Sequence, residues 1–133
     1  MNGEVVVPIR VDADVLVARQ KARELAKSLK FSSSELTLIA TAISEVARNI
    51  VTYAKQGEIV LQLVSRGHRR GIRVVAHDDG PGIADVKLAM EDGYSTSSSL
   101  GLGLPGSKRL MDDFDIVSAV GKGTTVTMTK WER

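Results

Sequence analysis

A carboxylate and a carboxamide lie four residues apart in the segment Glu45-Val46-Ala47-Arg48-Asn49. In a helix Glu45 and Asn49 share one face, one turn apart, because the helix repeats every 3.6 residues. The amide oxygen of Asn49 is a neutral hard ligand that suits Mg²⁺ beside phosphates and water. The carboxylate of Glu45 can take a proton from an attacking hydroxyl. This pair lies on the helix face opposite the apolar stripe of Ile39, Ile43, Val46 and Ile50. The alternative interpretation is therefore an ordinary solvated helix face.

A second candidate is the segment Asp78-Asp79-Gly80-Pro81-Gly82, which follows an apolar strand. Strand side chains alternate between faces, so Asp78 falls on the face of the alternate apolar residues before it. A carboxylate that faces a core needs a hydrogen-bond donor, and the amino group of a flat heterocycle would provide one. Gly80 and Gly82 permit close approaches that side chains forbid. A simple strand-end turn also fits, since Asp and Gly are common in turns.

A glycine-rich loop spans residues 100–106 and leads into a helix. Its glycines fit a G-x-G-x-x-G pattern, but the strand before it and the acidic residue after it that a dinucleotide-binding fold requires are missing. A P-loop is excluded because Ser107-Lys108 stands where Lys-Ser/Thr is needed. What remains is a phosphate site at the helix N-terminus, built from free N–H groups and the helix dipole.

Hydrophobic periodicity predicts the elements that position these residues. We expect strands over 4–11, 58–65, 72–78, 114–120 and 124–131, and helices over 12–30, 32–55, 84–92 and 104–113. Ser32 and Glu35 form a capping box. Consecutive hairpins imply a mixed, mostly antiparallel sheet with the helices on one face. The predicted fold class is therefore an α+β two-layer sandwich.

The segment Arg66–Gly71 is expected to form a polar hairpin turn. It carries three arginines, Arg66, Arg69 and Arg70. We interpret them as a solvated hairpin tip, with binding of an acidic partner as the alternative.

Composition limits the function classes. The 133 residues, 43% hydrophobic and 26% charged, fit a single domain over 1–133. A net charge of only +2 does not predict a nucleic-acid partner. The absence of cysteine excludes disulfides and Cys-ligated metals. No apolar run approaches the roughly 20 residues of a membrane span, and the N-terminus is unlike a signal peptide. We expect a cytoplasmic protein without a membrane partner.

The order of the motifs resembles the ATP-binding (Bergerat) fold of the GHKL superfamily, which includes gyrase, Hsp90, histidine kinases and MutL. Within that superfamily, the chain is similar to the small bacterial partner-switching serine/threonine protein kinases. The segments that carry this similarity are TAISEVARNI, DDGPGI, MEDGYSTS, GLGLPGSKRLMDDF and the C-terminal KW.

The resemblance implies binding of ATP and Mg²⁺. The nucleotide-binding residues that it implies are Asn49, Asp78, Gly80, Gly82, Gly101, Gly103 and Thr125. Asn49 would hold Mg²⁺, and Glu45 would orient or deprotonate the acceptor hydroxyl. Asp78 would accept the adenine amino group, with Thr125 supporting the same ring. Gly82 would let the base approach, Gly101 and Gly103 would wrap the phosphates, and residues 93–100 would be a lid.

The resemblance further implies an ATP-dependent protein serine/threonine kinase that phosphorylates STAS-domain (anti-sigma antagonist-like) proteins. It implies a stressosome-type complex from which the kinase is released to engage a downstream effector, such as a phosphatase. An anti-sigma factor of the same fold is the first alternative, and a non-catalytic nucleotide-gated binding module is the second. A histidine kinase is disfavoured because no phosphoacceptor histidine precedes Asn49 on a helix.

Overall fold

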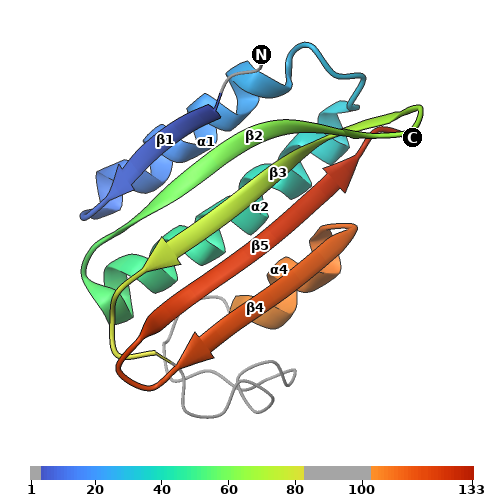
Figure 1. The fold of residues 1–133 in the computed structure, drawn as a ribbon. Helices are drawn as coiled ribbons and strands as arrows, with labels where there is room; N and C mark the ends of the chain where they lie inside the picture. The colour runs from blue at the N-terminus through green and yellow to red at the C-terminus, as the bar shows by residue number, and fades with distance from the viewer. Residues whose placement is uncertain (1–3, 83–102) are drawn as a thin grey trace.

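The computed structural model describes residues 4–82 and 103–133. The helix expected over 84–92, the expected lid and Gly101 lie outside these ranges. The elements in chain order are β1 (Glu4–Ile9), α1 (Asp12–Ala26), α2 (Ser33–Asn49), the π-helix η1 (Ile50–Ala54), β2 (Gly57–Arg66), β3 (Arg69–Asp78), α4 (Gly103–Leu110), β4 (Asp113–Ala119) and β5 (Gly123–Trp131) (Figure 1).

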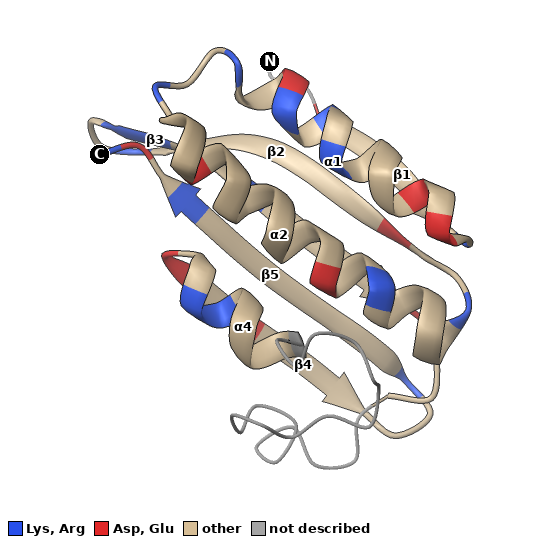
Figure 2. Cartoon of the chain, turned by 180° about the vertical axis from the view of Figure 1, so that it is seen from behind, with Lys and Arg blue, Asp and Glu red and all other residues tan. Residues whose placement is uncertain are grey.

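The five strands of the described ranges form one sheet in the order β1-β2-β3-β5-β4, and every neighbouring pair is antiparallel. The helices α1, α2 and α4 cover one face of this sheet, and no other helix or strand of the described residues covers the opposite face (Figures 1 and 2). This arrangement confirms the predicted α+β two-layer fold with helices on one face. Within the described residues, no helix combines the length and the hydrophobicity that a membrane crossing would require.

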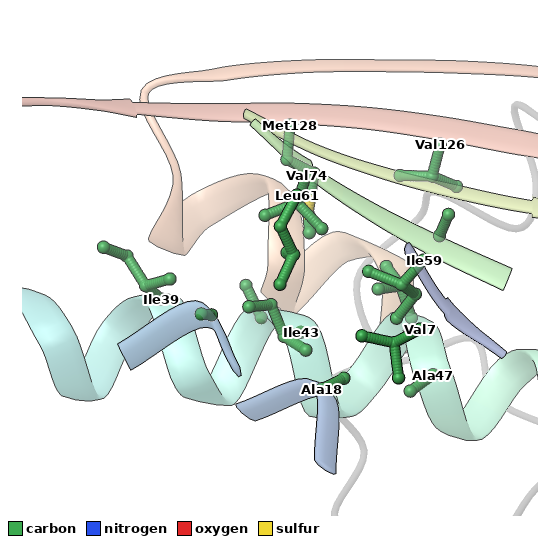
Figure 3. Packing of buried hydrophobic residues seen from close by; sticks show 14 of the residues in the cluster. Val7, Ala18, Ile39, Ile43, Ala47, Ile59, Leu61, Val74, Val126 and Met128 are labelled. Atoms are coloured by element: carbon green, nitrogen blue, oxygen red, sulfur yellow. The ribbon is translucent and has the colours of Figure 1, made fainter. Parts of the chain in front are cut away.

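The hydrophobic core lies between the sheet and α2, which packs against α1 on one side and α4 on the other. Figure 3 shows Ile39 and Ile43 of α2 turned toward Leu61, Val74 and Met128 of the central strands. The exposed fraction of each of these side chains is 2% or less. Full burial of such a side chain contributes about 1.5–3 kcal/mol, so this contact fixes α2 on the sheet.

The capping box at the start of α2 is confirmed. The hydroxyl of Ser32 accepts a hydrogen bond from the Glu35 backbone at 3.1 Å, and the Ser32 backbone N–H donates to the Glu35 carboxylate at 2.9 Å. These two bonds satisfy N–H groups that the first helical turn would otherwise leave unpaired. The position of every side chain along α2 is thereby set from its first residue.

The single helix expected over 32–55 is wrong at its end. The α-helix stops at Asn49, and η1 continues the chain to Ala54. Lys55 then takes a positive φ of 73° and donates its N–H to the Ile50 carbonyl at 2.8 Å. The spacing of the apolar residues could not reveal this change from α-helix to π-helix. In a π-helix each N–H bonds to the carbonyl five residues back instead of four, and this shift does not alter which residues of the segment are hydrophobic.

The six-residue hairpin turn expected over Arg66–Gly71 is also wrong. Strand pairing continues to Arg66 and Arg69, so only Gly67 and His68 form the turn. Gly67 has a φ of 61°, which suits glycine at the first central position of a type II′ turn. The arginines are exposed. Exposed arginines occur in strands as well as in turns, so their charge does not show where the strand pairing ends.

Candidate functional site

Several of the singled-out residues meet at one end of the sheet. β3 ends at Asp78 directly beside the start of β5, and Gly57, at the start of β2, is the register partner of Asp78. The end of α2 and η1 lie at the same end, because Ile50 packs against Gly57 (Figure 1). Gly103 is the first residue of α4, which packs against α2.

Asp78 points to the helix-covered face of the sheet, as its strand parity predicts, and its exposed fraction is 9%. One carboxylate oxygen, Oδ1, accepts the backbone N–H of Gly80 at 2.9 Å. Within the described residues, Oδ2 accepts no hydrogen bond, and it is not sealed from solvent. A nearly buried carboxylate with one free oxygen is suited to a donor from outside the chain.

The strand register separates Asp78 from Thr125. Thr125 lies opposite His77 on the open face of the sheet, and its hydroxyl is 2.8 Å from His77 Nδ1. The expectation that Asp78 and Thr125 contact one flat ring is therefore wrong in this geometry. Thr124 lies opposite Asp78 on the helix-covered face, so it is the threonine that can serve a shared ligand.

The glycines next to Asp78 are required by the contacts of the chain itself. A Cβ on Gly80 would lie 2.6 Å from the Ala54 Cβ. Gly82 has a φ of 78°, and a Cβ there would lie 2.0 Å from the Ala119 carbonyl oxygen. Gly123 has a φ of 82°, and a Cβ added there would lie 2.0 Å from the Asp78 carbonyl oxygen. These glycines hold the end of β3 tightly against η1 and the β4–β5 turn.

Glu45 lies inside the protein and not on a solvated helix face. Its exposed fraction is 5%, and every residue from Ala42 to Ala47 is buried. A carboxylate in such surroundings needs a partner. The Arg48 guanidinium lies 3.2 Å from the Glu45 carboxylate, and the Arg48 side chain is about half exposed. The carboxylate is thus held in place at the margin of the core.

Asn49 is the last residue of α2 and is partly exposed. In the described part of the chain, its side-chain amide makes no hydrogen bond, so its oxygen is available to a ligand. The π-helix begins at the next residue, and π-turns of this kind occur frequently at functional sites. Glu45 and Asn49 lie one turn apart, as predicted, but Glu45 is the more enclosed of the two.

Sequence reasoning missed two residues of this site, Arg48 and Thr124. Arg48 stands three residues after Glu45, a spacing at which opposite charges on a helix meet. Thr124 could be chosen over Thr125 only with the register between β3 and β5 known, because a shift of one residue moves a side chain to the other face.

Comparison with known proteins shows that residues 8–130 match the family model of the histidine kinase-like ATPase domain. The chain is 47% identical over 133 residues to the serine/threonine-protein kinase RsbT of Bacillus subtilis, with both chains covered completely. It is 32% identical over 120 residues to the anti-sigma F factor of a Thermoanaerobacter species, covering 86% of this chain and 82% of the relative.

Solved structures share the fold. A structure of the RsbU and RsbW domains of a Mycobacterium tuberculosis protein matches with a TM-score of 0.63 and 22% identity, and the match covers this whole chain and 33% of that longer one. The mycobacterial sensor histidine kinase MprB matches with a TM-score of 0.58 and 18% identity, over 100% of this chain and 99% of that one. The sheet with helices on one face is therefore an architecture common to these proteins.

Proposed function

The chain belongs to the histidine kinase-like ATPase family and is an ATP-dependent serine/threonine protein kinase, and we propose that it phosphorylates STAS-domain regulatory proteins. The observation that carries the proposal is the 47% identity to RsbT over the full length of both chains. On this proposal, the kinase resides in a stressosome-type complex in the cytoplasm, and its release lets it activate a downstream effector.

The adenine end of the nucleotide is assigned to Asp78 and Thr124. The free Oδ2 of Asp78 would accept the adenine amino group, and the Thr124 hydroxyl projects from the neighbouring strand on the same face. The Thr124 hydroxyl lies 2.8 Å from the Ser118 hydroxyl, and the Ser118 hydroxyl donates its proton to the Gly123 carbonyl at 3.0 Å. This network fixes the Thr124 side chain, which supports its use in recognising a rigid ring.

The phosphates are assigned to Gly101 and to Gly103 at the first turn of α4. Unpaired backbone N–H groups and the positive end of the helix dipole favour anions at a helix N-terminus. Gly103 is the residue at which α4 begins, as this assignment requires. Gly80 and Gly82 contribute by keeping the end of β3 close to its neighbours, which holds Asp78 in place.

The residues fit a magnesium ion that is bound mainly by phosphates. Among the described residues, no three or more His, Cys, Asp or Glu side chains form a metal cluster. Mg²⁺ commonly takes one or two protein ligands together with phosphates and water, and the free amide oxygen of Asn49 fits this role. Bound there, Mg²⁺ would neutralise charge on the transferring phosphoryl group.

Glu45 is assigned to the acceptor hydroxyl of the substrate. It lies one turn before Asn49, and Arg48 at 3.2 Å restrains its carboxylate. Positioning and charge neutralisation account for most of phosphoryl-transfer catalysis, so one oriented carboxylate near the acceptor is sufficient. Arg48 acts through Glu45 and is a positioning residue.

The proposal is tested by incubating the chain with γ-labelled ATP, Mg²⁺ and purified STAS-domain proteins. We expect label on a serine or threonine of the partner, and loss of label when that residue is replaced by alanine. If no STAS-domain partner is labelled while ATP still binds, the proposal fails, and the non-catalytic nucleotide-gated binding module takes its place.

An anti-sigma factor is the second candidate function. It is supported by the 32% identity over 120 residues to a protein named anti-sigma F factor. Co-purification of the chain with sigma subunits of RNA polymerase would favour this function. Failure to bind any sigma subunit, together with labelled STAS-domain protein, would favour the switch kinase.

A further inference from the structure

The β2–β3 hairpin tip carries an arginine pair, Arg66 and Arg69, on the open face of the sheet. These residues are direct partners on the two strands, and both are exposed. Like charges placed opposite each other across two strands destabilise the pairing. Within the described ranges, neither guanidinium forms an ion pair with a carboxylate. The hairpin therefore holds two positive charges together, and no carboxylate of the described residues pairs with either of them.

Both guanidinium groups lie over the ring of Trp131. The Cζ atoms of Arg66 and Arg69 are 5.0 and 5.2 Å from the ring centroid, within the range of cation–π attraction. The exposed fraction of Trp131 is only 3%. Its ring NH donates to the Asp113 carboxylate at 2.7 Å. Gly71 leaves space for the ring, because a Cβ there would lie 2.9 Å from Trp131 Cε3. The ring is a fixed base for the arginine pair.

The acidic residues nearby are already engaged. Glu132 binds Arg70 through two hydrogen bonds of 3.0 and 3.2 Å. Asp112 pairs with Arg133 at 2.7 Å, and Asp113 holds the indole. The described acidic residues thus compensate Arg70 and Arg133, and none of them pairs with Arg66 or Arg69.

We propose that the arginine pair is a docking site for a carboxylate-rich segment of a protein partner. Two preorganised guanidinium groups match carboxylates, and an arriving carboxylate relieves the repulsion between them. The neighbouring Asp and Glu side chains and the small net charge of +2 disfavour an extended polyanion such as a nucleic acid.

This docking site is remote from the nucleotide site. Arg69 begins β3 and Asp78 ends it, and ten strand residues span about 30 Å. A partner can therefore dock at the arginine pair while the other end of the sheet is engaged with nucleotide. The proposal does not depend on the identity of the phosphorylated substrate.

Trp131 supplies the readout, because it is the chain's only tryptophan. We would titrate the full chain with a decapeptide of glutamate and follow indole fluorescence, with a glutamine decapeptide and a thymidine decamer as comparisons. The double variant Arg66→Glu/Arg69→Glu removes the site. Arg19→Glu/Arg23→Glu makes the same charge change at two exposed residues of α1, on the other face of the sheet.

We expect saturable binding of the glutamate peptide that weakens with salt, because exposed charges are screened. Reversal of the arginine pair should weaken binding by about tenfold or more, and the α1 control should weaken it by less than about threefold. ATP affinity should be unchanged in both charge-reversal variants, which shows that they are folded. The neutral variant Arg66→Gln/Arg69→Gln should lose an intermediate amount of affinity for the glutamate peptide. No binding, equal losses in the two reversals, or equal binding of the glutamine peptide or the thymidine decamer would overturn the proposal.

Discussion

Asp78 and Thr124 face each other across β3 and β5, on the side of the sheet that the helices cover. The neighbouring pair, His77 and Thr125, faces the open side. Because the pleat alternates strictly, only the first pair can contact a ligand held between the sheet and α2. This relationship favours Thr124 over Thr125 in the proposed nucleotide site.

Thr124→Val should lower ATP affinity, and Thr125→Val should not. Loss of one hydrogen bond to a bound ligand costs about 1 kcal/mol, which corresponds to an increase of about fivefold in the dissociation constant. Calorimetric titration of both variants with ATP checks this. A loss of affinity in Thr125→Val alone would show that Thr125, and not Thr124, contacts the nucleotide.

Asn49→Ala should weaken ATP binding in the presence of Mg²⁺ and leave metal-free binding almost unchanged. The substitution removes a hard oxygen ligand at a partly exposed position, so it disturbs the fold little. Calorimetry with and without Mg²⁺ measures the difference, which we expect to be about tenfold or more. An equally large Mg²⁺ effect in the variant would remove Asn49 from the metal site.

Gly123→Ala should destabilise the fold far more than Gly121→Ala. Both glycines have a φ near 80°, at 82° and 78°, so an added side chain is strained at either position by about 1–2 kcal/mol. At Gly121 the Cβ would meet open space, whereas at Gly123 it would lie 2.0 Å from the Asp78 carbonyl oxygen. Urea unfolding should show an additional loss of about 1–3 kcal/mol for Gly123→Ala. Equal losses would mean that the β3–β5 contact is not tight.

Glu132 should make the stability of the chain depend on pH. The backbone N–H of Lys30, with help from Arg70, lowers the pKa of the Glu132 carboxyl below its ordinary value of 4.5. A carboxyl whose pKa is lower in the folded state stabilises the fold above its unfolded pKa, and this contribution is lost as the pH falls through the folded pKa. Glu132→Gln should therefore be less stable than the unmodified chain at neutral pH, and the gap should close below pH 4.5. A gap that is constant with pH would contradict this.

The fold could be predicted from the sequence because its main signals are local. The Ser32–Glu35 capping box, the apolar stripe of α2 and the alternating strands are each determined by neighbouring residues. The limits of elements were less predictable. The turn at Gly67 and the π-helix after Asn49 depend on which backbone groups pair, and polarity does not encode this pairing.

The site could be predicted only where one element decides the geometry. The inward direction of Asp78 follows from parity within β3, and the structure agrees. The burial of Glu45 and the choice of Thr124 over Thr125 depend on contacts between elements that are far apart in the chain. Helical spacing placed Glu45 opposite the apolar stripe, but α2 lies between two other helices and is buried there on several sides.

The central claim is that Glu45 acts on the acceptor hydroxyl while the phosphoryl group passes from ATP to the partner. It is tested most directly by measuring single-turnover transfer from ATP to a STAS-domain protein. The variant Glu45→Gln keeps the size of the buried side chain, and the companion variant Arg48→Gln keeps the carboxylate and removes the guanidinium that positions it. A group that acts on the acceptor hydroxyl contributes in the transition state and little to nucleotide binding. We predict that Glu45→Gln binds ATP with unchanged affinity, transfers phosphate about 10²–10⁴-fold more slowly, and is slower than Arg48→Gln. Transfer by Glu45→Gln at the unmodified rate would contradict the account.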